Sequence, residues 1–467
     1  MASYNLKYLI SISLISAMGG LLFGYDWVVI GGAKPFYEPF FGISGHAFLQ
    51  GWAMSCALVG CLAGAVLSGN LSDRFGRKRL LILSAALFIA ASMGTGAAHT
   101  FTGFVLFRIL GGVGIGLASN LSPMYIAEVT PGDVRGRFVS INQLTIVTGI
   151  LAAQIINWRI AKPVDPGATS LDILNSWNGQ SGWRWMFYAC TVPAMLFFML
   201  MWLVPESPRW MAKDPDRQPK ALKILSKIGG EAFARAEMDS IKDTMNNQVD
   251  SSRGSLLHMR IRKILIVGIV LAVFQQWCGI NVIFNYAQEI FAGAGYSVSD
   301  TLFNIVITGS VNLIFTFIGM FTVDRLGRKA LMLIGAGGLA GIYAVLGSMY
   351  FLRVQGIPML IMVVAAIACY AMSLAPVTWV VLSEIFPNRV RGKAMAVATF
   401  ALWSACFVLT YTFPVLNRLF GASGTFWLYG AICVSGFFFI LKKLPETKGK
   451  TLESIENELS GCNKPLP

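Results

Sequence analysis

Two similar stretches of sequence decide the fold. The first reads GNLSDRFGRK at residues 69–78, and the second reads TVDRLGRK at residues 322–329. Each follows an apolar run of helical length, and each places an Asp-Arg pair just before a glycine and two basic residues. The same motif at two distant points of one chain indicates an internal duplication. We therefore expect two related halves.

Two further motif pairs support the duplication. They occur in the same order in each half, and each contains an acidic residue that follows or ends an apolar run. The pairs are Glu128 with RGR at 135–137 and Glu384 with RGK at 391–393, and PES at 205–207 and PET at 445–447. Repeats in the same order at similar offsets predict two halves with the same orientation, a parallel repeat of the kind found in membrane transporters.

The composition sets the class of protein. Of the 467 residues, 55% are hydrophobic and 13% are charged, and the mean hydropathy is +0.63. Soluble domains carry about 25% charged residues, which excludes a cytosolic enzyme, a secreted disulfide scaffold and a disordered chain.

Runs of about 20 apolar residues match transmembrane helices. Twelve spans are expected, at residues 8–32, 48–70, 80–98, 102–125, 138–160, 183–204, 262–288, 302–323, 330–352, 357–381, 394–416 and 423–442.

The basic residues indicate the orientation. The chain has 37 Lys and Arg residues and a net charge of +14. If both termini are cytoplasmic, most of these residues fall in cytoplasmic loops, as the positive-inside rule requires. We therefore expect a multi-pass protein of the cell (inner) membrane with both termini in the cytoplasm. Its positive charge then faces membrane lipids, above all anionic lipids. Nucleic acid is not expected as a partner.

The repeat and the spans divide the chain into four segments. An N-terminal six-helix half is expected at residues 1–204 and a C-terminal six-helix half at residues 261–444. Between them, residues 205–260 form a polar linker with an amphipathic helical pattern. Residues 445–467 are expected to be a cytoplasmic tail.

The charged residues of the repeated motifs form a candidate gate. Opposite charges at helix ends can join neighbouring helices in the outward-facing state and separate when the inner gate opens. The alternative is that the arginines only follow the positive-inside rule, but the repetition of the acidic partners favours gating. The candidate gating residues are Asp73, Arg74, Arg77, Glu128, Arg135, Glu206, Arg209, Asp324, Arg325, Arg328, Glu384 and Arg391.

Two charged residues lie inside the expected spans. Asp26 lies deep in the first span, and Arg108 begins the glycine-rich part of the fourth. A charge at the centre of a membrane helix costs about 2.5–3.5 kcal/mol, so such residues are usually paired and functional. Desolvation and a nearby guanidinium act on a carboxylate in opposite directions, which lets its protonation respond to a change of surroundings. Proton coupling is the functional interpretation, and a static ion pair that fixes helix packing is the alternative.

Amides and indoles inside the spans indicate a ligand site. Sugars fit such a site, because their hydroxyl groups form hydrogen bonds with amides and their C–H faces stack on indole rings. At ~100° per residue the amides of the seventh span do not share one face. Either this helix is broken near Gly279, or some amides bond to neighbouring helices. The candidate residues are Gln275, Gln276, Asn281 and Asn285 in the seventh span, Asn312 in the eighth, Trp379 in the tenth and Trp403 in the eleventh.

No sequence pattern indicates an enzyme. The chain has three histidines, and it has no P-loop, GxSxG or HExxH motif. Its eight cysteines form no CxxC pair and mostly lie singly in apolar runs, where they are read as packing residues. Neither a metal site nor a cofactor is expected.

Together, the motifs resemble those of the sugar porter family of the major facilitator superfamily, and within it those of bacterial proton-coupled D-xylose symporters. The resemblance covers nearly the whole chain. The motifs are FGYD at 23–26, DRFGR at 73–77, PESPRW at 205–210, FQQ at 274–276, GIN at 279–281, SEIFP at 383–387 and PETKGKT at 445–451. The resemblance implies an all-α membrane protein with the major facilitator fold, in which 12 transmembrane helices form two halves and short intracellular helices are added.

The resemblance also implies residue roles. Asp26 and Arg108 would be the proton-linked pair. The sugar contacts would come from the amides of the seventh and eighth spans and from Trp379, with Phe23 and Trp403 as apolar walls. The family has an amide at the position of Ile150 and a polar residue at that of Leu402. It also has a tyrosine at the position of Asn285 and a glycine at that of Ala375.

These departures leave the sugar open. The family amides that are absent here would each supply hydrogen bonds, and one hydrogen bond contributes about 0.5–1.5 kcal/mol. Another pentose, a hexose or a less polar polyol is therefore possible as the substrate. The sequence predicts a monomeric, proton-coupled monosaccharide symporter that works by alternating access. The alternatives are a facilitative sugar or polyol uniporter, a proton–drug antiporter and a non-transporting sugar sensor.

Overall fold

The computed structural model describes residues 4–448 except 166, 252–258 and 387–389. Within these ranges the chain forms helices and no strand. This confirms the all-α class. The helices divide into two compact units: residues 1–27, 59–153 and 187–253 form unit 1, and residues 28–58, 154–186 and 254–467 form unit 2. The segment boundaries expected at residues 204, 260 and 444 stay predictions.

Unit 1 is built on close helix contacts at glycines. A Cβ on Gly24 would clash with the Ile146 carbonyl, and one on Gly60 would clash with the Ile109 carbonyl. Small residues let helix backbones approach closely where lipid provides no hydrophobic driving force. The helices of this unit, some of them shared with unit 2, are α1 (Leu6–Phe41), α2 (Ala47–Phe75), α3 (Arg77–Ala97), α4 (Phe101–Val129), α5 (Arg135–Ile160), α7 (Trp183–Met201), α8 (Pro208–Ala212), η2 (Pro215–Arg217) and α9 (Gln218–Ser251).

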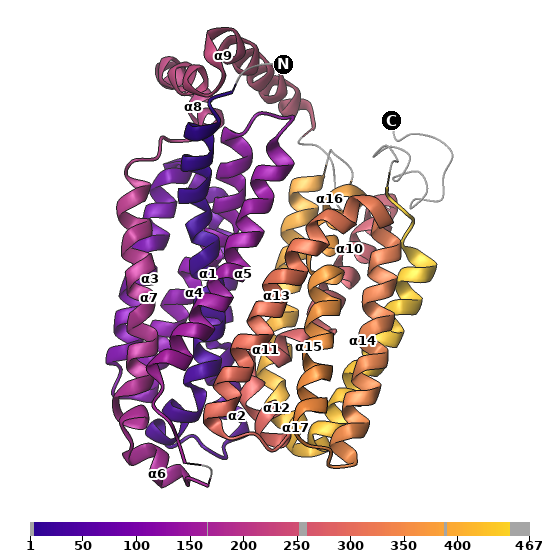
Figure 1. Cartoon of the computed structure of the whole chain (residues 1–467). Helices are drawn as coiled ribbons and strands as arrows, with labels where there is room; N and C mark the ends of the chain where they lie inside the picture. Colours follow the sequence, from indigo (N-terminus) through magenta and orange to yellow (C-terminus); the bar gives the residue numbers. More distant parts are fainter. Residues whose placement is uncertain (1–3, 166, 252–258, 387–389, 449–467) are drawn as a thin grey trace. The chain divides into compact units, whose positions relative to one another are not determined.

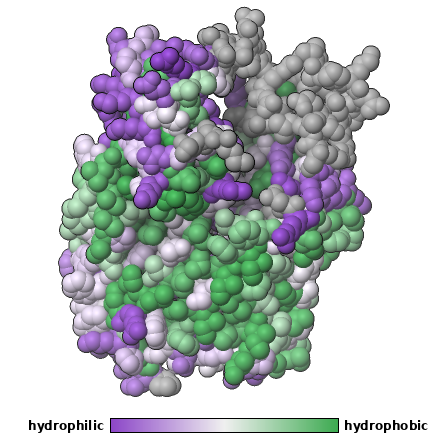
Figure 2. Space-filling view, turned by 45° about the horizontal axis from the view of Figure 1, so that its top comes forward, coloured by the Kyte–Doolittle hydropathy of each residue, from purple (hydrophilic) through white to green (hydrophobic). Residues whose placement is uncertain are grey.

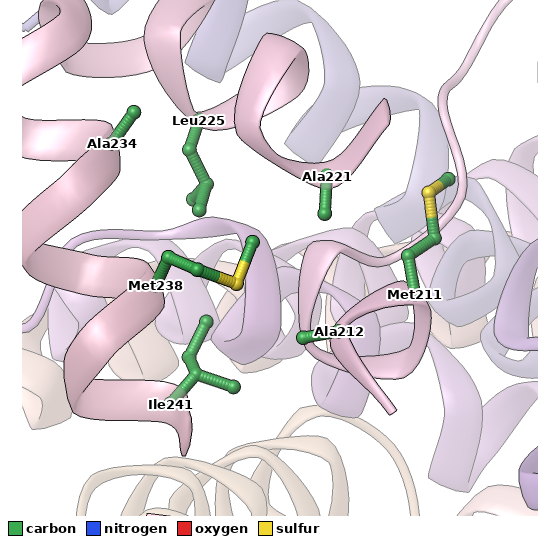
Figure 3. Close-up of a cluster of buried hydrophobic side chains, with 7 residues drawn as sticks. All are labelled: Met211, Ala212, Ala221, Leu225, Ala234, Met238 and Ile241. Carbon is green, nitrogen blue, oxygen red and sulfur yellow. The ribbon is translucent and has the colours of Figure 1, made fainter. Parts of the chain in front are cut away.

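The polar linker forms helices, as its amphipathic pattern predicts. Figure 1 shows α8 and α9 beyond the ends of α3 and α4. The chain bends inside α9, where Gly230 has φ +82°, a conformation that favours glycine. The two parts of α9 and α8 then enclose a small apolar core of their own (Figure 3). This core consists of Met211, Ala212, Ala221, Leu225, Ala234, Met238 and Ile241.

Unit 2 contains two broken spans and one long element that holds two spans. The seventh is interrupted at Gly279 (φ +85°) and Tyr286, and the tenth at Ser373 (φ −120°, ψ −86°). The eleventh and twelfth are joined as one element with a break at Gly421 (φ +66°). The helices that lie wholly in this unit are α6 (Ser170–Asn175), α10 (Met259–Trp277), α11 (Ile280–Asn285), α12 (Ala287–Gly293), α13 (Val298–Leu326), α14 (Arg328–Phe351), α15 (Ile357–Met372), α16 (Leu374–Ile385) and α17 (Arg391–Lys443), together with the short π-helix η1 (Asn178–Gly182).

The number of spans agrees with the sequence. Within the described ranges, 11 helices are long and apolar enough to cross a membrane, and the last runs over 51 residues, Lys393–Lys443. A hydrocarbon core of about 30 Å needs about 20 residues, so that element supplies two spans, divided at Gly421. The expected twelve spans are thereby confirmed. Exposed apolar side chains such as Val192 and Leu419 provide a surface suited to lipid. Figure 2 shows broad hydrophobic areas on the face in view.

Candidate substrate and coupling sites

The break at Gly279 brings three amides of the seventh span together. Asn281 Nδ2 donates to Gln276 Oε1, and Gln276 Nε2 donates to Gln275 Oε1 at 2.6 Å. Both alternatives derived from the sequence therefore hold at once, because Gln275 Nε2 also donates to the hydroxyl of Tyr370 on α15 at 2.8 Å. The result is a continuous hydrogen-bond chain across two spans. Sequence reasoning missed Tyr370, and its one signal was a tyrosine in an otherwise apolar span.

The remaining candidate site residues of unit 2 lie on four helices. Asn285 ends α11 and is buried, and its Oδ1 has no hydrogen-bond partner among the described residues. Asn312 on α13 and Trp403 on α17 are buried as well, whereas Trp379 on α16 is 37% exposed. A buried amide oxygen without a partner is costly, so Asn285 has an acceptor to offer to a ligand or water.

Three other positions named from the resemblance carry apolar side chains, namely Phe23, Ile150 and Leu402. Phe23 belongs to unit 1, is half-buried and packs edge-to-face on Trp27, with ring centroids 6.1 Å apart. Ile150 on α5 and Leu402 on α17 are both buried. The two positions at which the resembling family has polar side chains therefore carry buried apolar side chains here.

The two intramembrane charges of unit 1 form an ion pair. Arg108 Nη1 lies 2.7 Å from Asp26 Oδ1, and the two side chains are 4% and 6% exposed. The second carboxyl oxygen of Asp26, Oδ2, is buried without a hydrogen-bond partner in the described part of the chain. The guanidinium also lies 5.7 Å from the ring centre of Phe187. One carboxyl oxygen is thus held by the cation, and the other has no hydrogen-bond partner among the described residues.

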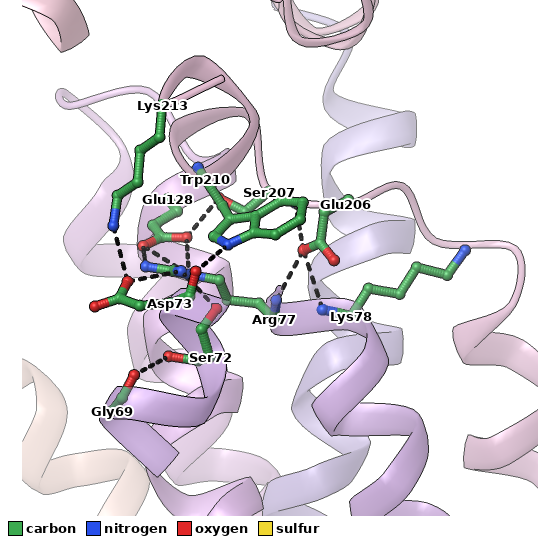
Figure 4. Close-up of polar contacts among 10 residues, drawn as sticks. All are labelled: Gly69, Ser72, Asp73, Arg77, Lys78, Glu128, Glu206, Ser207, Trp210 and Lys213. Atoms are coloured by element: carbon green, nitrogen blue, oxygen red, sulfur yellow. Dashed lines mark hydrogen bonds and ion pairs between the residues drawn. The ribbon is translucent and has the colours of Figure 1, made fainter. Parts of the chain in front are cut away.

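The first copy of the charged motif forms a dense cluster (Figure 4). Arg77 donates from Nε and Nη2 to the two oxygens of Glu128, each at 2.9 Å, and from Nη1 to Asp73 at 3.2 Å. Glu206 Oε1 accepts the backbone N–H groups of Arg77 and Lys78 and so caps the first turn of α3. The buried arginine therefore joins α2, α3 and α4.

Residues outside the predicted set complete this cluster. The Ser207 hydroxyl donates to Glu128, the Trp210 indole donates to the Asp73 carbonyl at 2.8 Å, and Lys213 lies 2.8 Å from the Asp73 carboxylate. All three follow the sixth span. The signal in the sequence was the PESPRW motif, which contains Ser207 and Trp210 and precedes Lys213.

The second copy repeats the core of the first. Arg328 Nη2 lies 3.0 Å from Glu384, and Glu446 accepts the backbone N–H groups of Arg328 and Lys329 at the start of α14. The Thr447 hydroxyl donates to Glu384 at 2.6 Å. Burial acts to raise the pKa of Glu446, but four backbone N–H groups, the largest contribution coming from Lys448, hold it below its ordinary value.

The other predicted gating residues lie outside these cores. Arg209 is 3.8 Å from Glu237, Arg135 is half-buried, and the Arg74 guanidinium lies 5.2 Å from the ring centre of Phe75. Arg325 contributes its backbone carbonyl, which accepts from Lys448 Nζ at 2.7 Å. The side chains of Asp324 and Arg391 lie outside the described residues.

A third charged cluster was not anticipated. The first span was expected to end at residue 32, but α1 continues to Phe41 and carries Lys34 in its buried part. Lys34 pairs with Glu38 at 3.4 Å and with Glu289 of α12, and it lies 4.6 Å from the ring centre of Tyr286. The helix can continue because two carboxylates and an aromatic face satisfy the lysine. Lys34 is therefore a buried helical residue, and the sequence had placed it in a loop.

Twelve apolar spans, a repeated charge motif and a broken helix with hydrogen-bonded amides are features of a multi-span membrane transporter. Residues 12–459 match the sequence profile of the family described as "Sugar (and other) transporter". The chain belongs to this family.

Individual relatives match over nearly their whole length. The D-xylose-proton symporter of Escherichia coli is 39% identical, with 97% of this chain and 96% of the relative covered. The arabinose-proton symporter of Bacillus subtilis is 37% identical with the same coverage. The inward-open structure of the xylose transporter XylE from E. coli superimposes with a TM-score of 0.84 at 38% identity, covering 96% of this chain and 99% of that chain.

Proposed function

We propose that the chain is a proton-coupled monosaccharide symporter that takes a pentose or hexose similar to D-xylose by alternating access. The observation that carries the proton coupling is the buried pair of Asp26 and Arg108, in which one carboxyl oxygen is left without a partner. Protonation of that oxygen weakens the ion pair, because it removes the charge that Arg108 neutralises. The names of the two symporters described above agree with this reading.

The sugar site is assigned to the amides and indoles of unit 2. In the chain of Asn281, Gln276 and Gln275, each of the two glutamines uses one N–H for a neighbour and keeps the other for a ligand. Since Ile150 and Leu402 are buried and apolar, the site offers fewer hydrogen bonds than one with amides there. The preferred sugar is therefore left open between D-xylose, another pentose, a hexose and a less polar polyol.

The cellular setting completes the proposal. The charged motifs follow the positive-inside rule when both termini are cytoplasmic in the inner membrane. The repeated clusters of Arg77 and Arg328 then lie on the cytoplasmic side as parts of the gate. The partners are the sugar, protons and membrane lipids, and the transporter acts as a monomer.

Asp26→Asn tests the coupling. In proteoliposomes, wild type should accumulate sugar against its gradient and alkalinise the medium when sugar is added. The variant should lose accumulation but keep sugar exchange, because Asn cannot be protonated. Asp239→Asn, an exposed carboxylate on α9, is the matched control and should behave as wild type. Full accumulation by Asp26→Asn would contradict the coupling role, and uptake without proton movement in wild type would establish a uniporter.

Gln276→Ala tests the sugar site. The variant removes the middle of the amide chain and should weaken binding of the preferred sugar by tenfold or more, about 1.4 kcal/mol. The measurement is a binding titration across pentoses, hexoses and polyols. Gln180→Ala, an exposed glutamine before α7, serves as the control. An unchanged affinity would remove the seventh span from the site.

A further inference from the structure

Unit 1 contains a cavity beside the first charged cluster, with which it shares Lys78, Glu206 and Trp210. Its volume is about 590 Å³, and its walls come from the start of α3, the end of α7 and the helices of the linker. The residues that matter for its chemistry are Lys78, Arg79, Trp202, Trp210, Arg217 and Lys220. Ligand sites for small molecules typically measure about 300–1,000 Å³, so the cavity is large enough for a phosphorylated headgroup.

The lining is strongly positive. Four of its side chains are cations, and the single carboxylate, Glu206, already accepts backbone N–H groups at the start of α3. Lys78 Nζ donates to the Trp202 carbonyl at 2.8 Å, and Arg217 is 2.9 Å from Asp214. These contacts hold two of the cations in place at the wall.

The other two cations have no counter-ion. Arg79 and Lys220 pair with no carboxylate in the ranges that the structure describes, and both are exposed. They come from different elements, α3 and α9, and meet at one cavity. Guanidinium and ammonium groups that converge without an acidic partner provide the donors that a phosphate requires.

The aromatic side chains indicate where the cavity lies in the membrane. Trp202 is 60% exposed at the end of the apolar helix α7, and the next residue, Leu203, is 76% exposed. Tryptophan is enriched at the level of lipid headgroups, where one side of the ring is apolar and the other is wet. Trp210 stacks under Arg217 at 4.5 Å and forms a flat inner wall. The basic groups therefore lie at the height of a lipid phosphate.

We propose that this cavity binds a phosphate group, supplied by an anionic phospholipid headgroup or by a soluble phosphate ester. Arg79 and Lys220 are the two residues that contact the phosphate, while Lys78 and Arg217 contribute positive charge from the wall. A headgroup held there would bridge α3 to the linker helices α8 and α9. The proposal does not depend on which sugar is transported or on proton coupling.

The test uses the full chain in nanodiscs. The probes are phosphatidylcholine alone, three parts phosphatidylcholine to one part phosphatidylglycerol, and phosphatidylcholine with added glycerol 3-phosphate. The readout is the thermal unfolding midpoint, because a ligand of the folded state raises it. Wild type should be stabilised by phosphatidylglycerol if the source is a lipid, and by glycerol 3-phosphate if the source is soluble.

Two charge-matched double variants decide the site. Arg79→Gln/Lys220→Gln should lose most of the stabilisation, whereas Lys223→Gln/Lys227→Gln, exposed on the same helix α9 but outside the cavity, should keep it. Arg79→Lys/Lys220→Arg preserves the charge and should restore at least part of the effect. Equal losses in the two neutral variants, or no stabilisation of wild type by either probe, would overturn the proposal.

Discussion

In the first copy of the charged motif the Arg77 side chain is 8% exposed and its partner Glu128 is 13% exposed, whereas in the second copy Arg328 and Glu384 are 15% and 24% exposed. The bonding core is the same in both. An arginine binds a glutamate, a second glutamate caps the helix that the arginine begins, and a hydroxyl donates to the first glutamate. The two clusters therefore differ in exposure because of the residues around these shared bonds.

The chain that follows each half provides those surroundings. After the sixth span, α8 places Trp210 and the adjacent Lys213 against Asp73, and these contacts cover the first cluster. After the twelfth span, Lys448 reaches the Arg325 carbonyl but no comparable helix covers the second cluster within the described residues. Duplicated motifs thus produce duplicated bonds, and in the first copy the contacts of Trp210 and Lys213 with Asp73 add to these bonds. We expect the first cluster to be the stronger of the two.

The largest expected effect comes from removing the glutamate partner of the arginine. Glu128→Ala leaves Arg77 buried without its main counter-ion and should lower the free energy of unfolding by about 3 kcal/mol. Glu384→Ala leaves a more exposed arginine and should cost about 1 kcal/mol. Chemical unfolding of the detergent-solubilised protein measures both. The double variant Arg77→Ala/Glu128→Ala should cost less than the sum of the two single changes, and equal losses in Glu128→Ala and Glu384→Ala would contradict the comparison.

A smaller effect is expected from the capping glutamates. Glu446→Gln replaces a carboxylate that caps α14 and should cost about 1 kcal/mol at neutral pH. Because the pKa of Glu446 is lowered in the folded state, its contribution is present above the ordinary pKa of a glutamate and is lost as the pH falls through the lowered value. Stability measured against pH should therefore show a decline on the acid side in wild type.

That decline should be reduced in Glu446→Gln. Glu206→Gln provides the comparison in the first copy, where the same cap is formed at α3. An acid-side decline of the same size in wild type and in Glu446→Gln would contradict the capping role.

The smallest effect is expected from the hydroxyl groups. Ser207→Ala and Thr447→Val each remove one hydrogen bond to a motif glutamate and should cost about 0.5–1.5 kcal/mol. The first should cost more, because Glu128 is the more buried acceptor. Thermal unfolding midpoints of both variants, with the exposed Ser44→Ala between α1 and α2 as control, make the comparison. A larger loss in Thr447→Val would reverse the order of the two clusters.

Much of this architecture could be predicted because it depends on local properties. A run of about 20 apolar residues defines a span wherever it lies, and the repeat at residues 69–78 and 322–329 defines two halves. The pairing of Asp26 with Arg108 was expected from the family resemblance, and the two side chains form an ion pair. The break at Gly279 was one of two alternatives and was decided by its φ of +85°.

Contacts between distant segments could not be predicted. Tyr370 meets Gln275 and Glu289 meets Lys34 because of how broken helices pack, and no spacing in the sequence encodes either contact. For the same reason Lys34 was read as a loop residue: a lysine in a membrane helix is costly unless partners from elsewhere satisfy it.

Hydrophobic length and charge are properties of single segments, so the sequence was enough to establish the class of protein, the number of spans and two of the intramembrane charges, Asp26 and Arg108. The tertiary structure alone decided how deeply each charged cluster is buried and which amide faces which partner. It also decided that Arg79 and Lys220 share one cavity. Burial and hydrogen bonding depend on groups that are far apart in the chain, and only folding brings those groups together.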